Sequence, residues 1–98
     1  MRVITRRRLK EFGDGHADAV RPLDAWFRMM RAARFRAPEE LKTIFPAASF
    51  LGDTLTVFNI AGNKYRLVVN MRYDLGRVYI RQVLTHEDYD RLTRRGVL

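Results

Sequence analysis

The 98-residue chain contains no cysteine. This absence excludes disulfide scaffolds, thiolate zinc sites and cysteine nucleophiles. Serine is nearly as scarce, because Ser49 is the only one and no nucleophile-elbow pattern surrounds it. Long apolar runs are also missing: no segment approaches the roughly 20 residues that a membrane-spanning helix needs. The N-terminus lacks the apolar stretch of a secretory signal. We therefore expect a cytoplasmic protein without a membrane contact.

Histidine is limited to His16 and His86, which lie far apart in the chain. No carboxylate pair and no HExxH-like spacing accompanies either one, so the sequence predicts no metal site. Phosphate-cradling glycine loops are missing too, because "GDGH" lacks the downstream Gly, Lys or Ser/Thr that such loops require. We expect neither a metal nor an organic cofactor.

Acidic residues are outnumbered, with 11 Asp and Glu against 19 Lys and Arg, which gives a net charge of +8. Such an excess favours an anionic partner. Most of the cations are arginine, which suits bidentate contacts with phosphate, so nucleic acid is the leading class of partner. Apolar residues make up 47% of the chain. That is enough for one compact core, and we expect a single domain over residues 1–98.

The first half of the chain predicts mainly helices. Residues 1–5 ("MRVIT") predict an edge strand, and residues 6–12 predict one or two helical turns. Two glycines in "GDGHADA" predict a loop over residues 13–19, and Asp18 is a predicted N-cap for the next helix. That helix presents apolar residues at helical spacing, namely Leu23, Trp26, Phe27, Met30 and Ala33. Residues 37–46 predict a short helix that buries Leu41, Ile44 and Phe45.

The second half changes to the period of strands. Residues 54–60, 64–74 and 77–84 are rich in β-branched and aromatic residues and are separated by tight turns, which predicts a three-strand meander. A last helix is expected from His86 onward. The fold class is therefore α+β, an antiparallel sheet with a layer of two N-terminal helices and a short C-terminal helix.

Residues 64–74 ("KYRLVVNMRYD") alternate almost strictly between core and polar side chains. The polar face is expected to hold Lys64, Arg66, Val68, Asn70 and Arg72. On the next strand Tyr79, Arg81, Val83 and Thr85 are expected to share one face. If that face is the one that carries Arg66, Arg81 completes a cationic patch. A solvated outer face, which antiparallel sheets often have, is the alternative.

The helix that follows begins at "THEDYD". Thr85 is a predicted N-cap, and Asp88 three residues later can complete a capping box. This structural role leaves His86 and Tyr89 unexplained, and their spacing places them on neighbouring positions of one helix face. A histidine and a tyrosine beside arginines suit metal-free RNA cleavage through the ribose 2′-hydroxyl. Alternatively, Tyr89 packs on the core and His86 is merely exposed.

Three segments together resemble the HigB-type toxins of bacterial type II toxin–antitoxin systems, which are relatives of the RelE toxins. They are "LDAWFRMMRAARFRAPEELKTIFPAASFLGD", "VFNIAGNKYRLVVNMRYD" and "VYIRQVLTHEDYDRL". "GHADA" is similar to the family's His-Pro-Asp-Ala segment, with Ala17 in place of the usual proline. The resemblance implies a RelE-like fold and an mRNA endonuclease that acts on translating ribosomes. It also implies a HigA-type helix-turn-helix antitoxin, through which the complex binds operator DNA.

The functional positions that the resemblance implies are Asn63, Lys64, Arg66, Arg81, His86 and Tyr89. We expect Arg66 and Arg81 to hold the scissile phosphate. His86 and Tyr89 would transfer protons or stack a base, and Lys64 would act as a base or acid. Asn63, Asn70 and Arg72 are predicted RNA contacts.

Basic residues outside this group are Arg6, Arg7, Arg8, Lys10, Arg28 and Arg31. They are expected to contact ribosomal RNA, although a solvated helix face explains them equally well. Two other functions stay open: a gyrase poison of the ParE type, which has the same fold class, and a non-catalytic RNA-binding module.

Overall fold

The computed structural model describes all 98 residues, with four α-helices and five strands. The strands are β1 (Arg2–Ile4), β2 (Ser49–Leu51), β3 (Leu55–Ile60), β4 (Tyr65–Arg72) and β5 (Arg77–Thr85). The helices are α1 (Arg7–Gly15), α2 (Val20–Ala32), α3 (Pro38–Ile44) and α4 (His86–Arg94), with a short 3₁₀ turn, η1 (Ala17–Ala19), before α2. None of these helices has both the length and the apolar character that a membrane span requires. The predicted α+β class is confirmed.

The strands form one sheet in the order β1-β5-β4-β3-β2. The predicted meander is present, because β3, β4 and β5 pair as antiparallel neighbours. The expectation of a purely antiparallel sheet is wrong, since β1 pairs with β5 in parallel. A hairpin turn forces antiparallel pairing, whereas β1 and β5 are separated by the rest of the domain and no turn sets their direction. The edge strand β2 was not predicted, because three residues are too few to show an alternating pattern.

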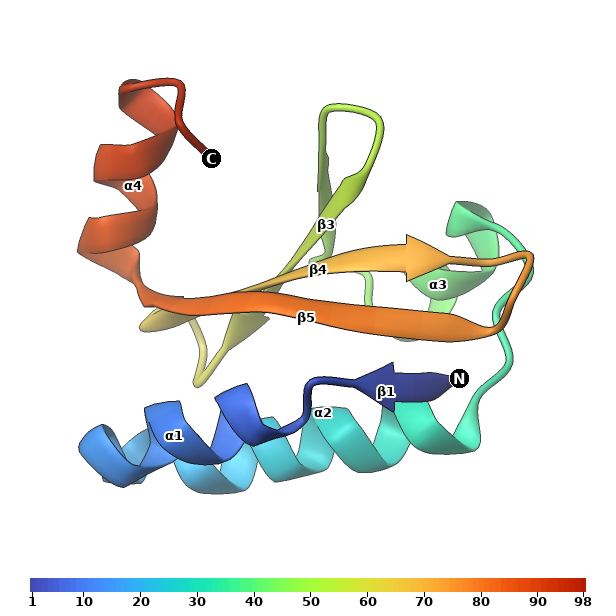
Figure 1. The fold of residues 1–98 in the computed structure, drawn as a ribbon, viewed down its shortest axis with the longest axis horizontal. Helices are drawn as coiled ribbons and strands as arrows, with labels where there is room; N and C mark the ends of the chain where they lie inside the picture. The colour runs from blue at the N-terminus through green and yellow to red at the C-terminus, as the bar shows by residue number, and fades with distance from the viewer.

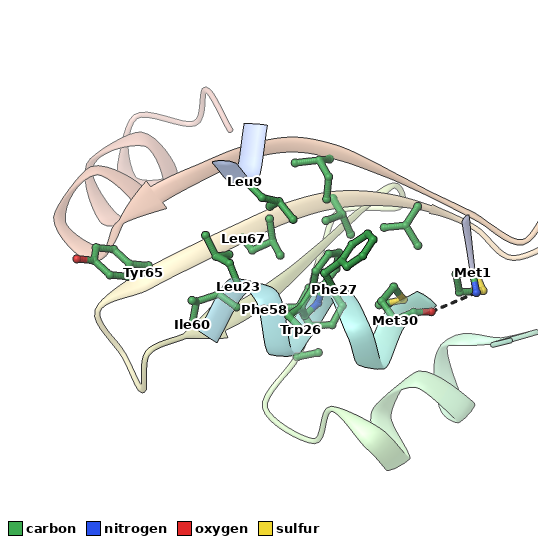
Figure 2. Close-up of a cluster of buried hydrophobic side chains, with 14 of the residues drawn as sticks. Met1, Leu9, Leu23, Trp26, Phe27, Met30, Phe58, Ile60, Tyr65 and Leu67 are labelled. Carbon is green, nitrogen blue, oxygen red and sulfur yellow. Dashed lines mark hydrogen bonds between the residues drawn. The ribbon is translucent and has the colours of Figure 1, made fainter. Parts of the chain in front are cut away.

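Helices α1 and α2 lie side by side along one face of the sheet, and α4 projects from the end of β5 (Figure 1). The predicted apolar stripe of α2 forms the centre of the core: Leu23, Trp26, Phe27 and Met30 are all buried. Figure 2 shows these side chains gathered against Phe58 and Leu67 of the sheet, with Tyr65 apart from the others at one end. Burying one such side chain stabilises the fold by about 1.5–3 kcal/mol. This core fixes β4 against α2.

Two predictions about the helical half are wrong. Helix α1 continues through Gly13 to Gly15, where the glycines predicted a loop. A β-carbon on Gly13 would lie 3.0 Å from Cγ2 of Val20, so glycine here allows α1 and α2 to approach closely. In α3, Leu41 is fully buried as expected, but Ile44 is 49% exposed. A seven-residue helix presents only one narrow face to the core, and Leu41 occupies it.

A β-bulge interrupts the pairing of β4 with β5. Val68 is opposite Gln82, but the next residue of β4, Val69, is opposite Ile80, so Arg81 is an extra residue without a partner. The bulge changes which residues of β5 share a face. Tyr79 is opposite Asn70 on the outer face, whereas Val83 is opposite Leu67 in the core. The expectation that Tyr79, Arg81, Val83 and Thr85 share one face is therefore wrong.

Candidate functional site

The candidate site lies where the beginning of β4 meets the end of β5 and the first turn of α4. The register places Tyr65 opposite Thr85, which brings Lys64 next to His86. The backbone N–H of His86 donates to the carbonyl oxygen of Lys64 at 2.8 Å. Sheet pairing thus joins the two segments, "GNKYRL" and "THEDYD", that the sequence singled out.

Helix α4 begins as predicted. The Thr85 hydroxyl accepts a hydrogen bond from the backbone N–H of Asp88 at 3.2 Å, which satisfies one of the free donors of the first turn. The second half of the capping box does not form, because the Asp88 carboxylate accepts instead from Arg91 at 2.8 Å. No residue of α4 is fully buried. The position of the helix therefore depends on this cap and on its contacts with β4 and β5.

Arg66, His86 and Tyr89 form one cluster on the outer side of the sheet. Nη2 of Arg66 lies 3.4 Å from Nδ1 of His86, and its guanidinium carbon lies 5.8 Å from the centre of the Tyr89 ring. Arg66 also donates to the carbonyl oxygen of Asn63 at 3.0 Å. On the far side of the imidazole, Nε2 of His86 is 3.2 Å from the Asp90 carboxylate. The structure thus brings together four of the predicted site residues, Asn63, Arg66, His86 and Tyr89.

Lys64 belongs to an adjacent cluster that the sequence did not predict. Its ammonium group forms an ion pair with Asp18, which also accepts a hydrogen bond from the Tyr65 hydroxyl at 2.5 Å. These contacts lower the pKa of Asp18, chiefly through the hydrogen bond from Lys64, and raise the pKa of Lys64 through the same bond. The hydrogen bond to Asp18 raises the pKa of Tyr65 as well. Lys64 and Tyr65 therefore keep their protons at neutral pH.

The prediction that Asp18 is a helix N-cap is wrong. Ala19 occupies the N-cap position of α2, and no side chain caps that helix. Asp18 lies one residue earlier, inside η1, from where its carboxylate reaches across to β4. The local sequence suggested a helix cap, because it contains no information about the tertiary contact of Asp18 with Lys64 and Tyr65.

A hollow of about 460 Å³ opens between η1, the β3–β4 turn and the start of α4. It is lined by His16, Asn63, Lys64, Tyr65, Thr85, His86 and Glu87. Both histidines of the chain therefore line the same hollow, although they lie far apart in the sequence and His16 was not expected near the site. His16 was not among the predicted site residues, and the one pattern that could have suggested it is its place in "GHADA", near Asp18.

Arg81 stands apart from this group. It is exposed in the bulge of β5, its side chain makes no hydrogen bond to the other site residues, and its carbonyl oxygen accepts from Arg8. Asn70 and Arg72 lie toward the far end of β4. The amide of Asn70 donates to the carbonyl oxygen of Thr54 at 2.9 Å, and Arg72 forms a two-point ion pair with Asp74 at 3.0 and 2.8 Å.

The predicted cations of α1 and α2 lie on the helical layer, away from the hollow. Arg7 pairs with Glu11 at 3.3 Å, and Arg28 pairs with Asp24 at 2.9 Å. The guanidinium of Arg6 lies 3.8 Å from the centre of the Phe27 ring, and that of Arg31 lies 5.9 Å from it. These cations form a second basic surface, separate from the candidate site.

The hollow and the adjoining cluster of Arg66, His86 and Tyr89 together suit an RNA phosphodiester. Arg66 and Lys64 are fixed cations for a phosphate, His86 is an imidazole for proton transfer, and Tyr89 offers an aromatic ring for a base. No group of three or more His, Cys, Asp or Glu side chains is placed to hold a metal ion.

Comparison with known proteins is consistent with this chemistry. Residues 19–92 match the model of the HigB toxin family, described as the RelE-like toxic component of a toxin–antitoxin system. The mRNA interferase toxin HigB of Escherichia coli strain K12 is 33% identical over 95 residues, which cover 95% of this chain and 91% of that protein. The mRNA interferase HigB of Shigella flexneri has the same identity and coverage. The mRNA interferase HigB of Escherichia coli O6:H1 is 24% identical over 96 residues, with 96% and 93% of the two chains covered.

Proposed function

Because this chain belongs to the HigB family, the RelE-like toxic components of toxin–antitoxin systems, we propose that it is an endoribonuclease that cleaves mRNA and arrests growth. The relatives it resembles over nearly their whole length are named mRNA interferases. The observation that carries the proposal is the contact of Arg66 with both His86, which lines the hollow, and Tyr89. This contact brings together a cation that can bind phosphate, an imidazole that can transfer a proton and an aromatic ring that can stack on a base.

Arg66 is the group proposed to bind the scissile phosphate. In the free protein its guanidinium is directed at the lone pair of Nδ1 of His86, since a guanidinium can only donate. A bound phosphate offers stronger, charge-assisted acceptors. We expect Arg66 to turn to that phosphate and stabilise the negative charge that develops on it. Arg81, which is not opposite Arg66 in the sheet, would contact a neighbouring phosphate of the RNA.

His86 is the proposed proton donor to the leaving 5′-oxygen. Nε2 of His86 is held by Asp90, which fixes the ring and can stabilise the imidazolium. Once Arg66 turns to the phosphate, Nδ1 becomes free to carry the transferred proton. Tyr89, next to Arg66, would stack on a substrate base. Asn63 would contact the RNA backbone at the edge of the hollow.

Lys64 is proposed to act as a fixed cation and not as a base. Asp18 raises the pKa of Lys64, so its amine does not offer a free lone pair near neutral pH. A cation beside the phosphate stabilises the crowded transition state by charge alone. The raised pKa of Lys64 therefore argues against the base role, one of the two roles that the sequence left open.

The partners follow from the toxin family. A toxic component of a toxin–antitoxin system has an antitoxin that neutralises it, and mRNA is its proposed substrate. We further propose that the antitoxin is of the HigA type, with a helix-turn-helix domain through which the complex binds operator DNA. Cleavage of message on translating ribosomes would place the protein in the cytoplasm, where the second basic surface on α1 and α2 would contact ribosomal RNA.

The test is to express Arg66→Ala, Arg81→Ala and His86→Ala in cells and to sequence the 5′ ends of mRNA. We expect lost growth inhibition and cleavage that is slower by ~10²–10³ for Arg66→Ala, the usual effect of removing one stabiliser of developing charge. Arg94→Ala, which removes an exposed cation of α4 outside the site, is the matched control and should stay toxic. If all three site variants remain fully toxic, the assignment is wrong. Replication arrest with intact mRNA would indicate a ParE-type poison, and RNA binding without cleavage would indicate a non-catalytic module.

A further inference from the structure

We propose that His16 is the general base that removes the proton from the attacking ribose 2′-hydroxyl, an inference that rests on the proposed ribonuclease function. His16 lines the same hollow as Lys64 and His86, although it comes from the turn between α1 and η1. The hollow is thus bordered by one imidazole from the helical layer and one from α4. A substrate phosphodiester bound in the hollow would have both proton-transfer groups beside it.

The hydrogen bonding of His16 fixes which nitrogen is free. Nδ1 lies 3.1 Å from the carbonyl oxygen of Phe12. A carbonyl oxygen can only accept, so Nδ1 must carry the hydrogen. In the neutral ring, Nε2 then carries the lone pair, and no hydrogen bond within the protein occupies it. This is the protonation pattern that a general base needs.

The ring is also held in a defined orientation by its neighbours. It stacks on Phe12 with ring centres 3.9 Å apart and an angle of 5° between the planes. Tyr65 meets it edge to face at 5.4 Å and 75°. Tyr65 is anchored in turn by its hydrogen bond to Asp18. A base that is oriented before the substrate arrives loses little entropy in the reaction.

Of the other titratable groups around the hollow, all but the exposed carboxylate of Glu87 are already engaged. Lys64 is paired with Asp18, and the Tyr65 hydroxyl donates to the same carboxylate. Both nitrogens of His86 have partners, Arg66 on one side and Asp90 on the other. Only His16 combines an imidazole, a free nitrogen lone pair and a fixed orientation at this hollow.

The proposed reaction transfers one proton at each of the two histidines. Nε2 of His16 takes the proton from the 2′-hydroxyl, and the 2′-oxygen forms a bond to phosphorus. The bond between phosphorus and the 5′-oxygen breaks, and that oxygen takes a proton from the imidazolium of His86. The products are a 2′,3′-cyclic phosphate and a 5′-hydroxyl, and exchange of protons with water resets both histidines.

Two variants of the full chain separate a base from a packing residue: His16→Phe and His16→Ala. Phenylalanine preserves the stack between Phe12 and Tyr65 but has no nitrogen, whereas alanine leaves a space beside Phe12. We expect His16→Phe to lower kcat for mRNA cleavage in a translating extract by at least ~10²-fold with little change in KM, the usual contribution of a general base. Added imidazole should accelerate His16→Ala and not His16→Phe.

Wild-type activity of His16→Phe, or loss of activity in His16→Ala without any response to imidazole, would overturn the proposal and leave His16 a packing residue. Circular dichroism spectra show whether each variant folds. If one does not, His16→Gln serves in its place, because its amide can still donate to the Phe12 carbonyl but cannot act as a base. A wild-type protein that cleaves no mRNA contradicts the proposed function itself, so the two failures are distinguishable.

Discussion

Asp18 shows how one side chain can connect the helical layer to the site. It lies in η1, yet its carboxylate holds both the ammonium of Lys64 and the hydroxyl of Tyr65 on β4. Tyr65 in turn forms the edge contact that orients His16. One exposed carboxylate therefore helps to set the charge of one site residue and the orientation of another. Its substitution is expected to affect folding and catalysis together.

Asp18→Asn tests this link through the pH dependence of stability. The pKa of Asp18 is lowered in the folded protein, so its contribution is present above the unfolded pKa of about 3.9 and is lost as the pH falls through the lower folded value. The pKa of Lys64 is raised, so its contribution is present below about 10.4 and is lost as the pH rises through the higher folded value. The free energy of unfolding, measured with urea, should therefore be higher for the wild type than for the variant between these pH limits. Plotted against pH, the two free energies should converge in acid. A difference that persists unchanged in acid would contradict the ion pair.

At the scale of the elements, α4 is the least anchored helix of the site. It contains no fully buried residue, yet it supplies both His86 and Tyr89. The Thr85 cap fixes where its first turn begins, and the backbone bond from His86 to Lys64 ties that turn to β4. Small changes in the cap are therefore expected to move the catalytic groups relative to Arg66.

Thr85→Ala removes the capping oxygen and should lower the free energy of unfolding by ~1 kcal/mol. We expect a larger effect on catalysis, because misplacement of a catalytic group by about 1 Å can cost ~10²-fold in rate. Urea unfolding and mRNA cleavage measured side by side check both numbers. Thr85→Ser keeps the hydroxyl and should behave like the wild type. If Thr85→Ala unfolds more easily but cleaves at the wild-type rate, the cap does not position the site.

The elements also show how far the sequence predicts the structure. Periodicity predicted the core face of α2, and the Thr85 cap followed from local spacing, because both depend on neighbours in the chain. The bulge at Arg81 was not predicted, since the pattern of "RVYIRQVL" does not show which residue is left unpaired, and the extra residue appears only when β5 is paired with β4. Glycines in α1 misled the loop prediction because close packing against Val20 requires one of them.

Part of the candidate site was predictable from the types of residue and their order in the sequence. The part that depends on tertiary contacts was not. The sequence predicts Arg66, His86 and Tyr89 as site residues, and the three are in contact in the structure. The contact of Asp18 with Lys64, and the position of His16 at the same hollow, join segments that are more than 40 residues apart. Only the packing of α1 and α2 against the sheet brings such segments together.

At the scale of the whole molecule, the cations behind the net charge of +8 include two basic surfaces. One is the candidate site, with Lys64 in the hollow and Arg66 in the adjoining cluster, and the other is the second basic surface on α1 and α2. On that surface Arg7 and Arg28 already have carboxylate partners one helical turn away, whereas Arg31 has none. Exposed pairs of this kind contribute only a few tenths of a kcal/mol to stability, so these cations are readily available to phosphates.

Ribosome binding by the catalytically weakened His86→Ala protein is therefore expected to fall steeply with salt. Each phosphate neutralised by a lysine or arginine adds about 0.7–0.9 to the slope of log K against log salt concentration. Replacing both Arg7 and Arg31 by glutamine in that background should reduce the slope by roughly 1–2 if these residues contact ribosomal RNA. The measurement is sedimentation binding to ribosomes across a salt series, with Arg94→Gln as the matched control on the other side of the molecule. A slope that the double substitution leaves unchanged would mean that the helical cations are only a solvated face.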